Sequence, residues 1–318
     1  MSLGVHLGET MAYALGTLVG LGGGRLDVTF YGVRGSTPCA GDSTARYGGN
    51  TSCVVLTEPG HDPILFDLGT GLRYFGQACP ANQPLVAHAL VTHLHWDHVQ
   101  GLPFCPPLLC GGSQLEVYGP SHDGVGFAEA FDQLMRPPFF PVRAHELGSD
   151  IRFTTLDPGA RIEVAGATVT TAHVPHTDTT FGYRVERNGV SVAYVSDHQQ
   201  PTDPNHIDPA VLELCRDVDL LIHDAQYTET EFAVKSTWGH CTIEYAVHVA
   251  AEAGAKRLAL FHHDPEHDDD TIDLLQFAAA SSGSRRGLRQ VVAASEGMCI
   301  TLAGAPAHVS AASAVGRA

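Results

Sequence analysis

The residues best suited to chemistry lie at positions 92–98, which read Thr-His-Leu-His-Trp-Asp-His and directly follow a largely apolar run. Imidazole and carboxylate groups are the ligands that zinc and similar divalent ions prefer. Alternate side chains of a strand entering a turn lie on one side, so His93 and His95 can converge on one ion. Asp97 and His98 stand where a helix would begin and face a second point. We therefore predict that this segment serves two metal ions.

The pattern His-x-His-x-Asp-His resembles the signature of the metallo-β-lactamase-fold hydrolases, in which further ligands arrive singly after later strands. The resemblance implies that His176, Asp197 and His262 complete the metal set, with the Asp197 carboxylate shared by both ions. Two other histidines, His173 and His263, are the alternatives to His176 and His262. The resemblance favours His176, because its distance to the Gly-Tyr-Arg sequence that follows is similar to the histidine–Gly-Tyr-Arg pattern of this branch of the family. On this basis we assign the first ion to His93, His95 and His176, and the second to Asp97, His98 and His262.

The same resemblance implies an α/β (α+β) fold, the αββα sandwich of two mixed β-sheets with helices on the outer faces. An upstream Asp-Leu-Gly-Thr-Gly sequence resembles the family's first motif, in which Asp67 braces the metal loop through hydrogen bonds. Apolar runs bounded by Gly, Pro, Asp and Asn predict strands at residues 26–31, 53–56, 64–67, 86–92, 115–118, 161–164, 168–172, 181–185, 191–196, 220–223 and 257–261. Helices are predicted at residues 126–134, 209–216, 242–253 and 271–281.

A chain of 318 residues that is 44% hydrophobic can bury a full core. The candidate ligands are spread from 93 to 262 and must converge, which predicts one hydrolase domain over residues 26–302. Residues 1–25 are expected to be a flexible or peripheral segment, and residues 303–318 a tail rich in small residues. The eight cysteines show no disulfide-scaffold spacing and no apolar stretch reaches transmembrane length, so we expect a cytoplasmic protein without a membrane partner.

Two later motifs narrow the chemistry. The sequence at 220–226 resembles the His-Glu-Ala-Thr motif of tRNase Z-like phosphodiesterases, with Asp224 in place of the glutamate. The sequence Gly-His-Cys-Thr at 239–242 resembles their His-Ser-Thr motif, with Cys241 in place of the serine. The resemblance implies that Asp224 orients His240, which contacts the phosphate or protonates the leaving oxygen. We therefore give catalytic roles to Asp97, Asp224 and His240.

The expected function is that of a phosphodiesterase with two divalent ions, zinc first and manganese or iron as alternatives. Ions about 3.5–4 Å apart would share a hydroxide that attacks phosphorus. The formal net charge is −17, with 18 Lys and Arg against 35 Asp and Glu, which disfavours structured RNA because phosphate contacts dominate its binding. A small cyclic-nucleotide-like phosphodiester is the preferred substrate. The short passage from Gly182 to Asp197 also leaves no room there for a tRNA-gripping arm.

Several alternatives stay open. An acyl hydrolase of the lactamase or thioesterase type would use the same metals. A tRNase Z-like ribonuclease would use the same motifs, and a non-catalytic metal-bearing module would use only the metal ligands. A homodimer is common in the family.

Single residues also have alternative roles. His223 is either a hydrogen-bond donor at a strand end or a catalytic residue, and His240 could be a neighbour of a helix cap. The glycine-rich segments 34–36 and 47–52 either flank the metals or form ordinary turns. Residues 137–141 form either a lid or, as we prefer, a packed surface loop.

Overall fold

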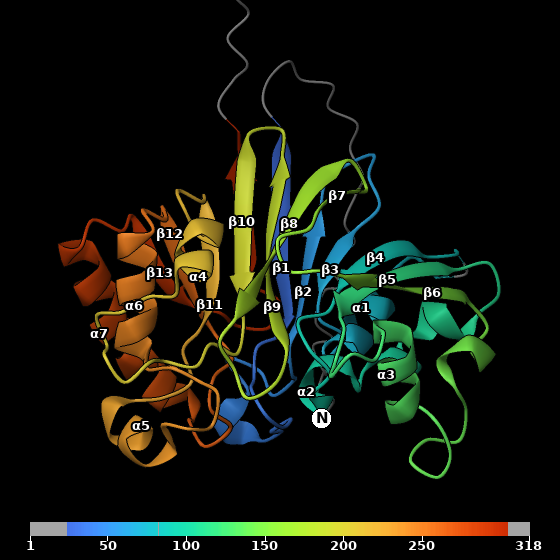
Figure 1. Cartoon of the computed structure of the whole chain (residues 1–318), viewed down its shortest axis with the longest axis horizontal. Helices are drawn as coiled ribbons and strands as arrows, with labels where there is room; N and C mark the ends of the chain where they lie inside the picture. The colour runs from blue at the N-terminus through green and yellow to red at the C-terminus, as the bar shows by residue number, and fades with distance from the viewer. Residues whose placement is uncertain (1–23, 82, 305–318) are drawn as a thin grey trace, which may run out of the picture.

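The strands form two mixed β-sheets packed face to face, with helices on their outer sides (Figure 1). The computed structural model describes residues 24–81 and 83–304. Within them each sheet has seven strands, in the orders β14-β1-β2-β3-β4-β5-β6 and β13-β12-β11-β10-β9-β8-β7. The predictions for the two termini fall almost entirely on residues outside these ranges. The two-sheet arrangement confirms the predicted fold class.

Each sheet has an antiparallel half and a parallel half. The strands of the first sheet are β1 (Arg25–Gly32), β2 (Cys53–Thr57), β3 (Ile64–Phe66), β4 (Val86–Leu90), β5 (Gln114–Pro120), β6 (Asp150–Leu156) and β14 (Cys299–Ala303). Those of the second are β7 (Arg161–Val164), β8 (Ala167–Val174), β9 (Thr180–Arg187), β10 (Val190–Val195), β11 (Leu220–Asp224), β12 (Arg257–Phe261) and β13 (Gln290–Ala293).

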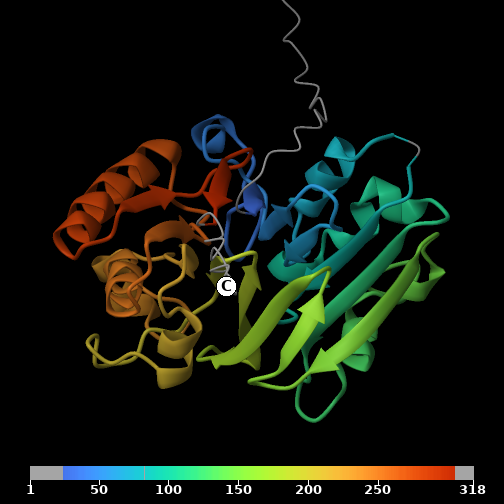
Figure 2. The ribbon, with the colours of Figure 1, turned by 90° about the horizontal axis from the view of Figure 1, so that it is seen from above.

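Most of the helices cover the outer faces of the two sheets. They are α1 (Leu72–Ala78), α2 (Trp96–Val99), α3 (Phe127–Leu134), α4 (Pro209–Leu214), α5 (Glu229–Lys235), α6 (Ile243–Glu252) and α7 (Asp269–Arg285). Seen from above, α6 and α7 (orange to red) lie on one outer side and the teal to green helices on the other (Figure 2). None of the helices in the described residues has the length and apolar character needed to cross a membrane.

The main core lies between the two sheets and explains why alternate residues along the strands are apolar. In β1 every second side chain is buried, as expected of a strand with one face on a core. The central side chains of this core include Val28, Phe30, Val54, Phe66, Tyr183, Tyr194 and Phe261. Further apolar clusters join the second sheet to α4, α6 and α7, and the first sheet to α1 and α3.

Every strand and helix that the sequence predicted is present, with ends that differ by a few residues. The sequence did not predict β6, β13, β14, α1 or α5. Most side chains of β6 and β14 are exposed or half-buried, since both lie at sheet edges, so they lack clean hydrophobic alternation. The predicted short connection between β9 and β10 is confirmed: Asn188 and Gly189, both with positive φ, close the hairpin.

Three strand ends share an unusual backbone conformation that points side chains toward one edge of the sandwich. Asp67, Asp197 and His262 follow β3, β10 and β12 with φ of 58°, 57° and 58°. Positive φ is uncommon for residues other than glycine and concentrates at functional sites. The three strand ends therefore supply strained, well-defined positions for polar side chains.

Candidate metal centre

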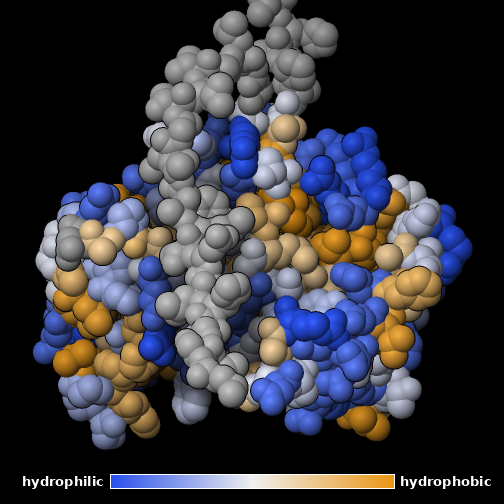
Figure 3. All heavy atoms as spheres, turned by 180° about the vertical axis from the view of Figure 1, so that it is seen from behind, coloured by the Kyte–Doolittle hydropathy of each residue, from blue (hydrophilic) through white to orange (hydrophobic). Residues whose placement is uncertain are grey.

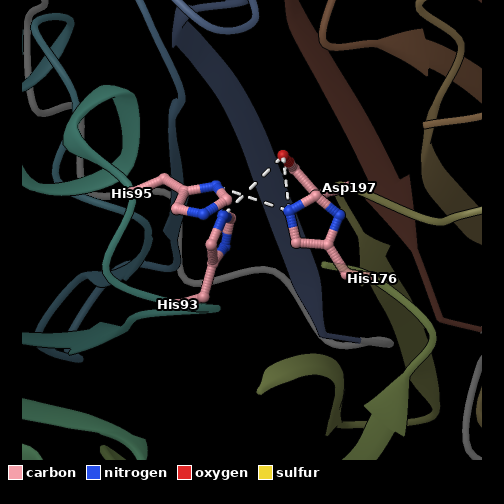
Figure 4. A group of neighbouring side chains, drawn as sticks. All are labelled: His93, His95, His176 and Asp197. Carbon is pink, nitrogen blue, oxygen red and sulfur yellow. Dashed lines mark hydrogen bonds and ion pairs between the residues drawn. The ribbon is translucent and has the colours of Figure 1, made fainter. Parts of the chain in front are cut away.

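One group of side chains combines His93 and His95 with His176 and Asp197. Their nearest ligand atoms all lie within 4.8 Å of one another. His93 Nε2 and His176 Nε2 are each 3.8 Å from Asp197 Oδ2, and His176 Nε2 is 3.4 Å from His95 Nδ1. Figure 4 shows the rings from the loop after β4 and the segment after β8 pointing toward one another beside the carboxylate. The arrangement presents three imidazoles and one carboxylate to a single point.

A second group, His98, Asp97 and His262, shares the same Asp197. His98 Nε2 and His262 Nε2 each lie 3.2 Å from Asp197 Oδ1. They lie 3.2 and 3.1 Å from Asp97 Oδ2. Because Asp197 turns Oδ2 to the first group and Oδ1 to the second, one carboxylate joins both groups.

The far nitrogen of several rings is held by a hydrogen bond, which orients the ring. His176 Nδ1 donates to the Gly239 carbonyl at 2.7 Å, and His262 Nδ1 donates to Gln226 Oε1 at 2.8 Å. His98 Nδ1 donates to Asp67 at 2.8 Å. Such partners fix the tautomer and leave the other nitrogen with a free lone pair. In each case the free atom is the Nε2 that faces the centre.

Asp67 braces the ligand segment as the sequence predicted. Its carboxylate is fully buried and accepts hydrogen bonds from the Thr92 amide, His98 Nδ1 and the Tyr194 hydroxyl, each at 2.8 Å. Thr92 Oγ1 also lies 3.0 Å from His93 Nδ1, which connects the network to the first group. One acid thus fixes the strand end and two candidate ligands.

The charges in the site suit cation binding. Burial lowers the pKa of His93, His95 and His176, which keeps these rings neutral, the form that binds metals. Burial opposes ionisation of Asp97 and Asp197, but the neighbouring histidines outweigh it and hold the pKa of both carboxyls well below the usual value. The same carboxylates outweigh the effect of burial on His98 and hold its pKa well above the usual value. The site therefore combines buried carboxylates with neutral imidazoles in the first group only.

Two buried nitrogen atoms without hydrogen-bond partners in the described ranges also indicate that these residues fit two divalent ions. His93 Nε2 and His98 Nε2 are buried and make no hydrogen bond within the described part of the chain. Buried polar atoms are nearly always paired, so each free nitrogen needs an explanation. Two mixed His and carboxylate sets that share one aspartate explain both atoms. His95 is exposed and His176 half-buried, so the first group lies at the mouth of the site.

Asp224 and His240 form a pair at the edge of the centre. His240 Nδ1 donates to Asp224 Oδ2 at 2.8 Å and lies 3.8 Å from Asp197 Oδ2. Asp224 also accepts from the His198 amide at 3.1 Å and the Gln226 amide at 3.0 Å. An oxygen of Asp224 lies close enough to His240 and His262 for the three residues to ligate an ion. Both Asp224 oxygens already accept hydrogen bonds, however, so we interpret Asp224 as a group that orients His240. Burial lowers the pKa of His240, but the Asp224 charge outweighs it and the net pKa is raised.

The structure brings together all the residues that the sequence proposed as ligands, and leaves their two competitors apart. His173 is exposed on β8. His263 is buried and donates through Nε2 to the Ala294 carbonyl at 3.0 Å, outside both groups. His223 Nε2 lies 3.0 Å from His198 Nδ1 beneath the centre, as a hydrogen-bonding partner at a strand end.

Some contributors had no specific signal in the sequence. The Ser36 amide, in a segment that received no assigned role, donates to Asp97 Oδ2 at 2.8 Å. A Cβ at Gly35 would lie 2.3 Å from His262 Nδ1, so this position needs glycine. The role of Gln226 was also missed, although it is the last residue of the recognised motif at 220–226. Backbone amides carry no residue signature, so only the glycine offered a clue.

The two-sheet fold and the shared His and Asp groups at its strand ends define a metallo-β-lactamase-fold protein. The chain belongs to the β-lactamase superfamily, because the family described as "Beta-lactamase superfamily domain" matches residues 21–263. This is a superfamily of metal-dependent hydrolases, and the match includes every candidate ligand.

Known proteins similar to the chain include ribonucleases and solved structures of the same fold. Ribonuclease Z of Natronomonas pharaonis is 28% identical over 301 residues, which cover 77% of this chain and 89% of that protein. The metallo-β-lactamase fold protein YhfI from Bacillus subtilis has a TM-score of 0.66 at 22% identity, covering 88% of this chain and 100% of that one. A diphosphatase from the PhnP family has a TM-score of 0.62 at 18% identity, covering 88% and 98%. The structural likenesses show the shared fold.

Proposed function

We propose that the protein is a metal-dependent phosphodiesterase that acts on a small, cyclic-nucleotide-like phosphodiester, with His240 as the proton donor. The observation that carries the proposal is the hydrogen bond of 2.8 Å between His240 and Asp224 beside the shared Asp197 carboxylate. Cleavage of a phosphodiester releases an alkoxide, which needs a proton as it departs. Acyl transfer on the same metals does not require this pair.

The metals would be held by His93, His95 and His176 on one side and by Asp97, His98 and His262 on the other, with Asp197 between them. Bound divalent ions would lower the pKa of a water molecule and neutralise charge on the phosphate oxygens. Zinc is the proposed metal, with manganese and iron as alternatives for this ligand set.

The protein groups would then position the substrate and handle the proton. Asp224 fixes the His240 ring through Nδ1, and Nε2 makes no hydrogen bond within the described residues. Nε2 is thus the atom that would face the leaving oxygen. Two hydrogen bonds of Gly239 hold the loop that carries this histidine. The Gly239 carbonyl accepts from His176 Nδ1 at 2.7 Å, and the Gly239 amide donates to Gln199 Oε1 at 2.8 Å.

A ribonuclease of the tRNase Z type is the second candidate, favoured by the names of the curated relatives. Three features argue against this candidate. Asp224 and Cys241 stand where the tRNase Z-like motifs have glutamate and serine, and the net charge of −17 disfavours binding of a long polyanion. The β9–β10 connection is also a tight hairpin, too short for a tRNA-gripping arm. These features lead us to prefer the small phosphodiester. Cleavage of a precursor tRNA in preference to cyclic AMP would reverse the order.

The test is hydrolysis of bis(p-nitrophenyl) phosphate by purified protein, after chelation and again with zinc or manganese restored. We expect chelation to abolish cleavage and either metal to restore it. A protein that holds two ions per chain, leaves this diester intact and cleaves p-nitrophenyl acetate would be an acyl hydrolase. A protein that holds two ions and cleaves neither would be a non-catalytic module.

A further inference from the structure

An apolar pocket lies beside the candidate metal centre. Its volume is about 470 Å³, within the range of about 300–1,000 Å³ that is usual for small-molecule sites. Its lining includes Thr70, Trp96, Val99, Phe104, Phe139 and Phe140. We propose that this pocket binds a planar aromatic group of the substrate, such as a nucleobase, while the phosphodiester lies at the metals. The inference rests on the proposed function and names the substrate class.

The pocket is continuous with the centre through helix α2. This one-turn helix carries Asp97 and His98 into the second ligand group, while Trp96 and Val99 line the pocket. On the other wall, Thr70 follows Gly69, where a Cβ would lie only 2.3 Å from the Asp97 carbonyl oxygen. Pocket wall and ligand segment are therefore in direct contact, so a group bonded to a phosphate at the metals can reach the pocket.

The chemistry of the lining selects a neutral planar group. No charged side chain is present among the described lining residues, so the pocket offers no positive charge to a further phosphate. Phe104 and Phe140 pack edge to face with ring centroids 6.0 Å apart, and Met135 adds a polarisable thioether. Gln100 and Gln133 supply hydrogen-bonding groups for the edge of a base.

The exposure of Trp96 supports a role in binding. Its side chain is 72% exposed and that of Phe139 is 75% exposed. Other apolar side chains are exposed elsewhere on the surface, including Phe277 on α7, and Figure 3 shows several such patches. Continuity with the ligand segment distinguishes the aromatic pocket from these patches. Any nucleobase can stack on an exposed indole face, because every base has a planar π-face.

The experiment uses the two tryptophans of the chain as reporters. Trp238→Phe leaves Trp96 as the sole indole, and the zinc-loaded full chain is titrated with AMP or with ribose 5-phosphate, which has the phosphate but no base. We expect AMP to quench Trp96 fluorescence and ribose 5-phosphate to leave it unchanged. Affinities for both phosphates are measured by isothermal titration calorimetry, which needs no indole, in the wild type and in every variant. AMP should bind about 5- to 150-fold more tightly than ribose 5-phosphate, the range that stacking of one base gives. Trp96→Ala should abolish this preference, and Phe277→Ala should retain it.

Phe139→Ala gives a second variant at an exposed wall of the pocket and should weaken the preference as well. Equal affinity of the wild type for the two phosphates would overturn the proposal, as would full AMP preference in both pocket variants. If Trp96→Ala keeps the preference but converts a dimer to a monomer by light scattering, the pocket is covered by a second copy and the proposal is wrong. Because binding is measured without turnover, AMP preference can hold even if bis(p-nitrophenyl) phosphate is not cleaved, which separates this inference from the proposed function.

Discussion

The role of His240 predicts a dependence on the leaving group. A proton donor matters when the departing oxygen is a strongly basic alkoxide, and matters little when it is p-nitrophenolate, which leaves at neutral pH without a proton. His240→Ala should therefore slow hydrolysis of 3′,5′-cyclic AMP far more than that of bis(p-nitrophenyl) phosphate. Both substrates use the same metals, so their ratio isolates the proton transfer.

The size of the effect follows from how well the ring is held. Asp224 accepts a hydrogen bond of 2.8 Å from His240 Nδ1 and is itself fixed by hydrogen bonds from two backbone amides. A positioned general acid contributes about 10²–10⁴-fold to the rate, or about 2.7–5.5 kcal/mol. We expect kcat for cyclic AMP to fall by this factor and that for bis(p-nitrophenyl) phosphate by less than about tenfold. His240→Asn, which can still donate to Asp224, should show the same selectivity.

The assay compares kcat on both substrates after zinc content has been measured for each variant. His173→Ala is the matched control, because it removes a histidine that is exposed on β8 and lies outside both ligand groups. An equal loss on both substrates by a variant with two zinc ions would refute the assignment. His240 would then be a phosphate ligand or a support of the centre.

Three further predictions concern metal binding and stability. Asp67→Asn should weaken metal affinity about 10- to 100-fold, measured by competition with a chromogenic chelator, because this acid orients the ligand segment. Gly35→Ala should release about one zinc equivalent per chain, since the added methyl would displace His262 from its place. Lys256 Nζ and a backbone amide overcome the effect of burial and lower the pKa of Asp219. Asp219→Asn should therefore cost about 1 kcal/mol, or about 2–4 °C in Tm, at pH 7.

Each of these has a contrary outcome. The stabilisation from Asp219 is present above its ordinary pKa, near 3.9, and is lost as pH falls through the lowered value, so the Tm gap should close below about pH 4. A gap that stays constant down to pH 3 would contradict it. Gly111→Ala is the control for Gly35→Ala, because the nearest atom to its added Cβ is 4.0 Å away. If both alanine variants retain two ions, or Asp67→Asn keeps full affinity, the reasoning on ring orientation is wrong.

The candidate ligands that the sequence proposed lie together in the structure, because metal chemistry restricts the residue types. His-x-His-x-Asp-His after an apolar strand has few other uses, and the later ligands each follow a buried strand. The groups that orient these ligands were harder to predict. Gln226 serves His262, but glutamine has no preferred role, and the Gly239 carbonyl and Ser36 amide are backbone groups common to all residues. Only three-dimensional contacts identify them.

The aromatic pocket illustrates a second limit. Residues 137–141 were predicted to be a packed surface loop rather than a lid, yet Phe139 is 75% exposed and lines the pocket with Phe140. The walls come from Thr70, from α2 and α3 and from the segments after these two helices, which no sequence motif joins. Hydrophobic patterning reports whether a side chain is apolar but not whether it faces a core or a cavity. The lining of the pocket was therefore less predictable than the candidate ligands.

The backbone at the strand ends links the fold to the centre. Asp67, Asp197 and His262 all have φ near 58°, a conformation that costs of order 1–3 kcal/mol at a residue other than glycine. Glycine would relieve the strain but would remove the Asp67 side chain that braces the ligand segment and the Asp197 and His262 side chains that converge on the centre. The buried strands β3, β10 and β12, whose side chains are nearly all covered, hold these positions in place. The stable core between the sheets thus maintains the strain that aims polar groups at one point, which is why the ligand geometry depends on the whole sandwich and not on the ligand loops alone.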